Sequence, residues 1–357
     1  MRDLHLVIAT IGRSSCPSVA REAIAREGRL ARLTIVAQGA RVVDDDLARL
    51  AAQRAVVLDE IVLARPVGAG RARYMGALLG NEDFVGFLDD DISFEAGSLS
   101  VLADACERVG LGGACGVVTV PRTSLVAVAV RTVCFRSIFR DPRPWATRRG
   151  RLVATNLLSG GMAVYRRALY DRCASSWRDF GPGTRGEDME LSYAVSRLAP
   201  LAVDPAVRVR NLSAQSSIHP EDATTRALRN LACYRGFGTR HARAPLQWLA
   251  YVVVLLAVAV RWLAVGAGAA FGRAVLSDVV TGAARALTAG VGPLLGARGR
   301  RARPIARKGD APGPAWMAAR RWARPPVHSP VERTVTNPDW SRDDERDGCR
   351  EAIDGVR

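Results

Sequence analysis

The residues best suited to chemistry are three consecutive aspartates, Asp89, Asp90 and Asp91, which follow the apolar run 84–88. Such a run predicts a strand buried on both faces. In an extended chain, Asp89 and Asp91 would point the same way and could share one hard cation. Carboxylate oxygens suit Mg²⁺ or Mn²⁺, and such an ion would stabilise a departing diphosphate. An acidic turn that caps the helix expected at 98–109 is the structural alternative.

A second acidic pair, Glu187 and Asp188, begins another expected helix, in which Leu191, Val195 and Leu198 share one face. Carboxylates are common in the first turn of a helix because the helix dipole favours negative charge there. Taken alone, the pair is therefore explained most simply as a cap. The functional alternative is a general base that deprotonates an acceptor hydroxyl.

A third segment, 68–76, joins an expected strand to an expected helix and contains Gly70, Arg71 and Arg73. Arg73 occupies the third glycine position of the dinucleotide-binding fingerprint, so that pattern fails. Backbone N–H groups and arginines near a helix N-terminus still suit a phosphate. An ordinary strand–helix loop is equally compatible with the segment.

Strands and helices are expected to alternate around these segments over the first 120 residues. Strands are expected at 4–8, 33–37, 56–63, 84–88 and 115–120, and helices at 18–30, 44–52, 71–79 and 98–109. This alternation predicts an α/β fold with a mostly parallel sheet, helices on both faces and right-handed crossovers. Ligands of such sheets bind beyond the carboxyl ends of the strands, where the aspartates are expected to lie.

The order of these segments resembles that of family 2 glycosyltransferases, which have the Rossmann-like GT-A fold. The likeness covers residues 4–240 and includes the strand ending in Ala9–Arg13, the 68–76 segment, the three aspartates, Ser159–Gly161 and Glu187–Asp188. The resemblance implies a metal-dependent glycosyltransferase that uses Mg²⁺ or Mn²⁺. Its reaction would be the inverting transfer of a sugar from a nucleotide-diphosphate sugar to an acceptor hydroxyl.

The same resemblance implies a role for each matching residue. Asp188 is the catalytic base with Glu187 as its acidic neighbour, and Asp89 and Asp91 are the metal ligands of a DxD motif. The residues implied in binding the nucleotide sugar are Thr10, Arg13, Gln38, Gly70, Arg71, Arg73, Asp89, Asp90, Ser159, Gly160 and Gly161. His219 stands where some relatives place a further metal ligand, although a loop histidine before Pro220 is the simpler interpretation.

Two departures from the family pattern bear on specificity. The second strand ends in Ala37-Gln38-Gly39, where the family often has an acidic residue, so the nucleotide is left open although Gln38 can still hydrogen-bond a base. Gln-x-x-Arg-Trp, the mark of processive synthases, is absent, so we expect one sugar per acceptor. An envelope or lipid-linked glycan or a natural product is the expected acceptor.

The chain is expected to divide into a catalytic domain (1–243), two apolar membrane-associated helices (244–297) and a basic, then mixed-charge, largely disordered tail (298–357). Residues 244–272 carry one charge, Arg261, and are long enough to span a bilayer. Spanning helices, helices lying on the membrane surface and buried helices of a soluble domain all remain open. The segment before them resembles the one that precedes the membrane-associated helices of bacterial rhamnosyltransferase-like members.

The composition of the chain excludes several other classes of protein. The chain has 357 residues, of which 48% are hydrophobic, so we exclude wholesale disorder and a fibrous protein. The net charge of +16 comes almost entirely from arginine, which GC-rich coding explains, so no nucleic-acid partner is expected. Seven cysteines without a CxxC pair and the lack of a signal peptide favour a cytoplasmic location, at the inner face of the cell membrane.

Two alternative functions remain. A sugar nucleotidyltransferase uses a similar sheet and metal, but it would need a lysine in a glycine-rich first loop, where this chain has Gly12 and Arg13. A non-catalytic basic protein of the membrane surface is the other alternative. The oligomeric state is left open.

Overall fold

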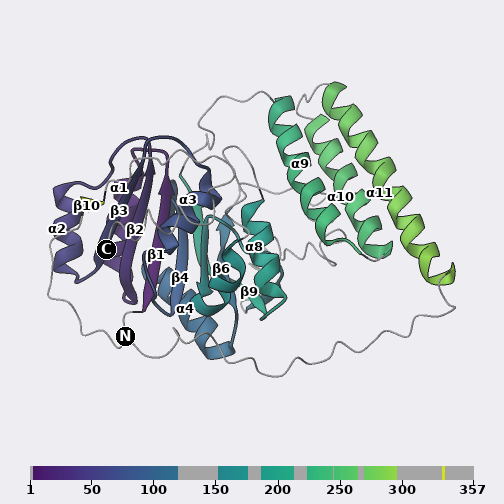
Figure 1. Ribbon diagram of the computed structural model, residues 1–357. Coiled ribbons are helices and arrows are strands. Elements are labelled where there is room, and N and C mark those ends of the chain that lie inside the picture. The colour runs from purple at the N-terminus through teal and green to yellow at the C-terminus, as the bar shows by residue number, and fades with distance from the viewer. Residues whose placement is uncertain are drawn as a thin grey trace, which may run out of the picture.

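The computed structural model describes residues 3–119, 152–175, 186–212, 223–243, 245–263, 269–295 and 332–333. One central sheet is flanked by helices, and three long helices stand side by side beyond one end of the sheet (Figure 1). The expected α/β class is therefore confirmed.

The N-terminal half contains the expected alternation. Its elements are β1 (Leu4–Thr10), α1 (Cys16–Arg26), β2 (Leu30–Gln38), α2 (Asp45–Gln53), β3 (Val57–Leu63), α3 (Ala69–Ala77) and β4 (Phe84–Asp89). The four strands are parallel in the order β3-β2-β1-β4. The expected cap of α2 is present, because the Asp44 carboxylate accepts a hydrogen bond from the Leu47 amide at 2.7 Å. Leu30 was expected to end a helix but instead begins β2, after the turn that follows α1.

The second half of the sheet is mixed. Its elements are β5 (Ile92–Phe94), α4 (Ser98–Val109), β6 (Gly113–Thr119), β7 (Val153–Thr155), β8 (Met162–Arg166), α7 (Arg167–Cys173), α8 (Glu187–Ser196) and β9 (Leu201–Asn211). Strand β8 lies between β4 and β6 and runs antiparallel to both. Strands β5, β7, β8 and β9 were not expected from the sequence.

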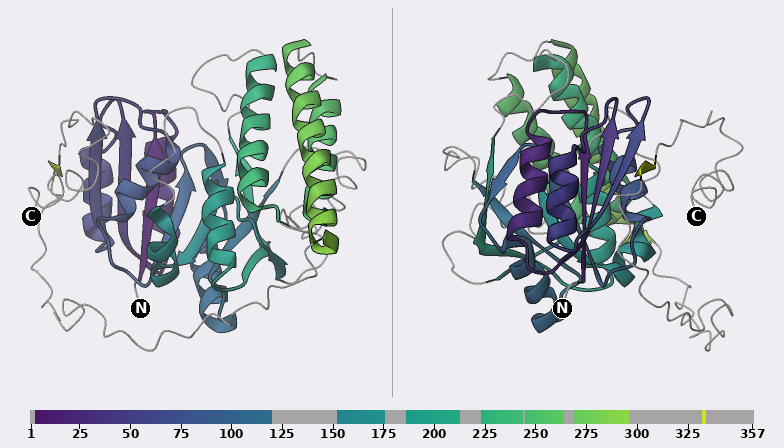
Figure 2. Two further views of the ribbon diagram at one scale, coloured as in Figure 1. Left: turned by 45° about the vertical axis from the view of Figure 1, so that its right-hand side comes forward. Right: turned by 90° about the vertical axis from the view of Figure 1, so that its left-hand side faces the viewer.

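Helices cover both faces of the sheet (Figure 2). Alternate residues of β1 face opposite ways, so Leu6 and Ile8 join one apolar core with α1, α2 and α4, while Val7 joins another with α3, α7 and α8. Leu191 of α8 is buried in the second core, but Leu198 is 42% exposed. The expectation for Leu198 was wrong because α8 ends at Ser196, before Leu198 could continue its apolar face.

The three remaining helices are α9 (Ala223–His241), α10 (Pro245–Leu263) and α11 (Ala269–Leu295), and they share a third apolar core. Gly238 permits the close approach of α9 and α10, because a Cβ at that position would lie 2.4 Å from the Tyr251 ring. Within the described part of the chain, no helix has the length and apolar character needed to cross a membrane. In the tail, β10 (Glu332–Arg333) pairs with β3, and the rest of 298–357 lies outside the described residues.

Candidate active site

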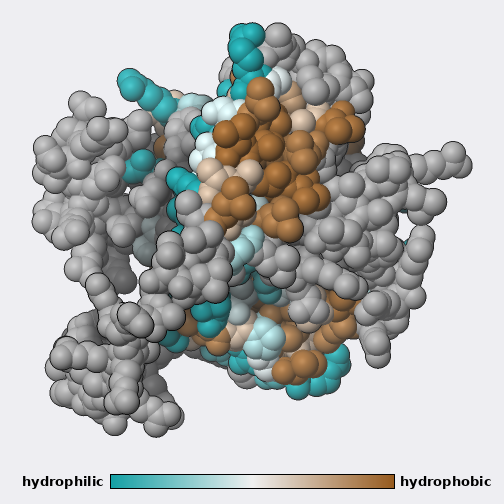
Figure 3. All heavy atoms as spheres, turned by 90° about the vertical axis from the view of Figure 1, so that its right-hand side faces the viewer, coloured by the Kyte–Doolittle hydropathy of each residue, from teal (hydrophilic) through white to brown (hydrophobic). Residues whose placement is uncertain are grey.

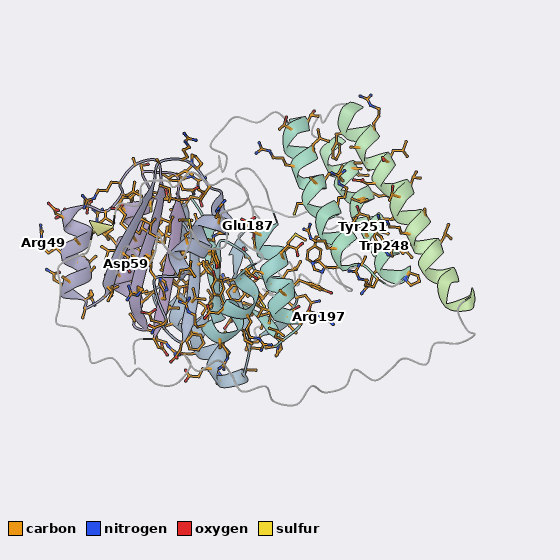
Figure 4. The ribbon with its side chains drawn as sticks, in the orientation of Figure 1. Arg49, Asp59, Glu187, Arg197, Trp248 and Tyr251 are labelled. Atoms are coloured by element: carbon orange, nitrogen blue, oxygen red, sulfur yellow. The ribbon has the colours of Figure 1, made fainter. Side chains whose placement is uncertain are left out.

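Acidic side chains from two distant segments meet at Arg73, a buried residue of α3. Its Nη2 donates to Asp89 Oδ1 at 2.5 Å, and its Nη1 lies 3.5 Å from Glu187 Oε1. Asp188 also acts electrostatically on this guanidinium. The end of β4 and the first turn of α8, where Figure 4 places Glu187, therefore share one site at the carboxyl edge of the sheet.

The ionisable groups at this site shift one another's pKa values. The pKa of Asp89 is raised to about 6: burial is the main cause, Arg73 opposes the shift, and the negative charges of Asp91 and Asp188 add to it. Burial and the adjacent Asp188 raise the pKa of Glu187 as well. Burial disfavours the charged form of Arg73, but the surrounding carboxylates outweigh that effect and raise its pKa. Perturbed acids gathered around a cation are typical of catalytic or anion-binding sites.

The turn 159–161 lies between the two acidic segments and contacts both; its place beside a donor sugar stays a prediction. The Gly160 amide donates to Asp188 Oδ2 at 3.0 Å, and the Asp89 amide donates to the Gly161 carbonyl at 2.9 Å. A Cβ at residue 160 would lie 2.5 Å from Asp188 Oδ2. Glycine is therefore required for the backbone to approach this carboxylate, and Ser159 beside it is buried.

Asp90 is fixed by the loop that follows β1. Thr10 Oγ1 donates to Asp90 Oδ2 at 2.5 Å, and Arg13 Nη1 donates to Asp90 Oδ1 at 3.0 Å. Ser15 Oγ donates to the Asp90 carbonyl at 2.6 Å, a contact that no sequence motif indicated. The structure thus brings together two segments of the expected donor site, the Thr10–Arg13 loop and the aspartates.

Asp91 does not follow the extended geometry expected for it. The chain turns at Asp90 and Asp91, so the alternation of an extended strand ends at Asp89. Asp91 forms an ion pair with Arg13, whereas Asp89 is paired with Arg73. The two carboxylates still lie near enough for Asp91 to raise the pKa of Asp89. The argument from strand periodicity therefore fails, although the proximity of the two carboxylates remains.

Gln38 contributes to the loop before α3. Its Oε1 accepts hydrogen bonds from the amides of Val67 and Gly68 at 2.8 and 3.2 Å. This oxygen therefore supports the loop, which leads into α3 with Gly70 buried and Arg71 half-buried. The contact of Gln38 with a nucleotide base stays a prediction, as do the roles of Gly70 and Arg71.

Asp89, Asp90 and Asp91 supply only oxygen donors, which suit Mg²⁺ or Mn²⁺. Within the described ranges, no cluster of three or more His, Cys, Asp or Glu side chains could hold a metal by itself. His219 lies outside those ranges. Mg²⁺ commonly takes one or two carboxylates and completes its shell with water and substrate phosphates. Asp89 and Asp91 fit an ion shared with a diphosphate, but not one held by protein alone.

Glu190 connects helix α8 to helix α9, and the sequence motifs did not indicate this residue. Its Oε1 accepts from Arg240 Nε at 2.9 Å and Nη2 at 2.5 Å, and its Oε2 lies 2.7 Å from His241 Nε2. Burial opposes its ionisation, but the hydrogen bonds from His241 and Arg240 outweigh burial and lower the pKa of Glu190. On another face of α8, Ser192 accepts from the Leu158 amide at 3.0 Å. The acids of α8 are therefore held between the sheet and α9.

Glu187 and Glu190 should affect stability in opposite ways. The raised pKa of Glu187 means that its charged form opposes folding, increasingly so as pH rises through that pKa. The lowered pKa of Glu190 means that its charged form favours folding, and this contribution is lost as pH falls. We expect Glu187→Gln to stabilise the ligand-free protein at pH 8 by about 1–2 kcal/mol, and less at pH 5. Glu190→Gln should destabilise it by about 1–3 kcal/mol at pH 8.

Denaturant unfolding at pH 5 and pH 8 measures both effects, with each variant serving as the control for the other. Both residues lie in the same helix and lose the same charge. Loss of stability at pH 8 in both variants would show that Glu187 is an ordinary structural acid.

No protein-family model matches the sequence, and no curated protein matches it. Solved structures are similar to this chain, among them the following three. Mannosyltransferase PcManGT from Pyrobaculum calidifontis, in complex with GDP-Man and Mn²⁺, is 15% identical over 83% of this chain and 88% of its own, with a TM-score of 0.46. S. aureus TarS 1–349 with UDP-GlcNAc is 14% identical over 82% of this chain and 92% of its own, with a TM-score of 0.45.

GalNAc-T7 with UDP, GalNAc and Mn²⁺ is 13% identical over 62% of this chain, has a TM-score of 0.46, and is covered over 46% of its own length. All three likenesses are too distant to carry an argument about chemistry. The functional conclusion therefore depends on the site itself.

Proposed function

We propose that this protein is a family 2 glycosyltransferase of the GT-A type. It would transfer one sugar, with inversion, from a nucleotide-diphosphate sugar to an acceptor hydroxyl. The observation that carries the proposal is the convergence of Asp89, Glu187 and Asp188 on the buried guanidinium of Arg73. Such a site can bind phosphate through its cation and accept a proton through a carboxylate.

Asp188 is the proposed base. The Gly160 amide holds one of its oxygens, Oδ2, at 3.0 Å, so the orientation of the carboxylate is set before an acceptor arrives. In a single displacement, the acceptor oxygen attacks the anomeric carbon and loses its proton to Asp188, while the bond to the diphosphate breaks on the opposite face. No second carboxylate needs to act as a nucleophile, because inversion takes a single step.

Arg13 and Arg73 are the proposed phosphate-binding cations. Both lie at the carboxyl edge of the sheet and already contact the aspartates. The Nε of Arg73 is buried and has no hydrogen-bond partner among the described residues. Asp89 and Asp91 would hold a divalent ion jointly with the donor, and that ion would neutralise negative charge on the leaving diphosphate.

Nucleotide sugars should stabilise the protein in a cation-dependent manner. A ligand at 100 times its Kd adds about 2.7 kcal/mol to the stability of the native state. We expect one member of a panel of UDP, dTDP, GDP and CMP sugars to raise Tm in the presence of Mn²⁺, and to do so less without it. Differential scanning fluorimetry measures this shift.

Asp91→Asn should reduce the cation-dependent part of the shift, whereas Asp204→Asn, a change on β9 away from the site, should preserve it. A panel that gives no shift in the wild type would contradict the proposal. Release of pyrophosphate from a nucleoside triphosphate and a sugar phosphate would instead favour the nucleotidyltransferase.

A further inference from the structure

Helices α10 and α11 expose large aliphatic side chains along one face each. Leu249, Leu256 and Val260 of α10 and Leu276, Val280 and Leu287 of α11 are between 48% and 71% exposed. Spacings of four and seven residues place each set on one side of its helix. Figure 3 shows apolar residues gathered in a continuous area on this side of the molecule. We call these six residues the aliphatic face.

The aliphatic face is additional to the apolar surface that the helices already bury. Trp248, Tyr251 and Leu255 of α10 point into the third core, as do Phe271 and Val275 of α11. Each helix is therefore apolar on two sides, whereas a helix at the surface of a globular protein is normally polar on its outer side. Large exposed apolar areas mark sites where a protein binds another protein or a membrane.

The charges beside the aliphatic face favour a membrane over a second copy of the chain. On α10 and α11, the exposed charged side chains that the structure describes are two arginines, Arg273 and Arg285. The acidic Asp278 of α11 is buried, and its Oδ1 lies 3.7 Å from Arg235 Nη1. A two-fold dimer would bring the same positive surface of both copies together. Anionic lipid headgroups would pair with these arginines instead.

The sequence after α11 adds to this positive charge. The basic residues within the next thirteen positions are Arg298, Arg300, Arg301, Arg303, Arg307 and Lys308, and no acidic residue occurs among them. A basic cluster that follows an apolar helix is typical of attraction to an anionic membrane surface.

We propose that α10 and α11 lie flat in the interface of an anionic bilayer, with the aliphatic face in the acyl boundary and Arg273 among the headgroups. Such binding needs a helix that is apolar along one exposed side and basic beside it, not one that spans the membrane. The proposal does not depend on the enzymatic activity proposed above. If that activity is correct, the contacts of Glu190 with α9 connect α8, which carries the proposed base, to the helices that would lie on the membrane. A membrane-bound, lipid-linked acceptor would then be the natural substrate.

Flotation of the full chain with vesicles tests the proposal. We expect the protein to float with vesicles of phosphatidylcholine and phosphatidylglycerol, to float less with phosphatidylcholine alone, and to be released by high salt. Leu276→Glu/Val280→Glu should reduce the bound fraction at least tenfold. The matched control is Val57→Glu/Val101→Glu, which adds the same charge at exposed valines of the sheet domain and should bind like the wild type.

Arg273→Glu provides a second test that leaves the aliphatic face unchanged, and it should weaken binding to anionic vesicles alone. Circular dichroism and Tm establish that each variant is folded.

Absence of wild-type flotation would overturn the proposal, as would equal binding of both double variants. A dimer in sedimentation that Leu276→Glu/Val280→Glu dissociates, without vesicle binding by the wild type, would assign the face to a second copy. Hydrolysis of a nucleotide sugar, measured without vesicles, tests the enzymatic proposal separately.

Discussion

Replacing Asp188 by asparagine should lower the rate of sugar transfer by about 10²- to 10⁴-fold, the usual contribution of a general base. Asparagine keeps the size of the side chain and an oxygen that can accept from the Gly160 amide. It cannot take the proton of the acceptor hydroxyl. The loss should therefore appear in kcat, whereas binding of the nucleotide sugar should change little.

Steady-state assays of transfer, or of slow donor hydrolysis where no acceptor is known, measure this effect. Asp204→Asn is the control, since the contact of Asp204 Oδ1 given by the described residues is a local hydrogen bond accepted from the Ala206 amide at 2.9 Å. Turnover of Asp188→Asn within a few-fold of the wild type would remove Asp188 from the role of base. Loss of donor binding in step with turnover would make it a binding residue instead.

Replacing Arg73 by methionine should destabilise the ligand-free protein by about 3–5 kcal/mol and abolish donor binding. Methionine fills much of the same volume but leaves the buried carboxylates without their cation. Removing one partner of a buried ion pair is strongly destabilising, because the remaining charge is buried without compensation. Arg73 is buried between Asp89 and Glu187, so solvent cannot replace the lost charge. Denaturant unfolding and the nucleotide-sugar Tm shift measure the two effects.

The control is Arg49→Met, because the Arg49–Asp46 ion pair on α2 is exposed and should contribute less than about 1 kcal/mol. Adding Glu187→Gln to Arg73→Met should recover part of the lost stability, since it removes one of the unpaired acids. An Arg73→Met protein as stable as the wild type would mean that the carboxylates do not depend on this guanidinium.

The N-terminal half of the sheet could be predicted because its signals are local. Runs such as 84–88 are apolar throughout, and Asp44 caps α2 with a side chain three residues from its donor. Strands β8 and β9 were missed because their stability comes from distant partners: β8 pairs with β4 and β6, and β9 pairs with β6 and β5. In β9 a local signal was present but was not used, because the buried Val207 and Val209 alternate with the exposed Arg208 and Arg210.

The arrangement of the candidate site also depends on residues that are distant in sequence. Arg73 was noticed as a possible phosphate ligand, but its position between Asp89 and Glu187 depends on how α3, β4 and α8 pack. Glu190 had no signal beyond being an acid in the first turn of a helix, since Arg240 and His241 lie about fifty residues away in sequence. Asp91 illustrates the opposite error, in which the alternation of a strand was extended two residues past its end, into a turn.

The anomeric configuration of the released sugar tests the central proposal most directly. With an α-linked nucleotide sugar that stabilises the protein, proton NMR can record the product before it mutarotates. Single displacement by a nucleophile activated by Asp188 predicts the β-anomer at first, together with the nucleoside diphosphate. Initial release of the α-anomer would contradict that chemistry. Cleavage between the phosphates, giving sugar phosphate and nucleoside monophosphate, would show that the carboxylates around Arg73 serve another reaction.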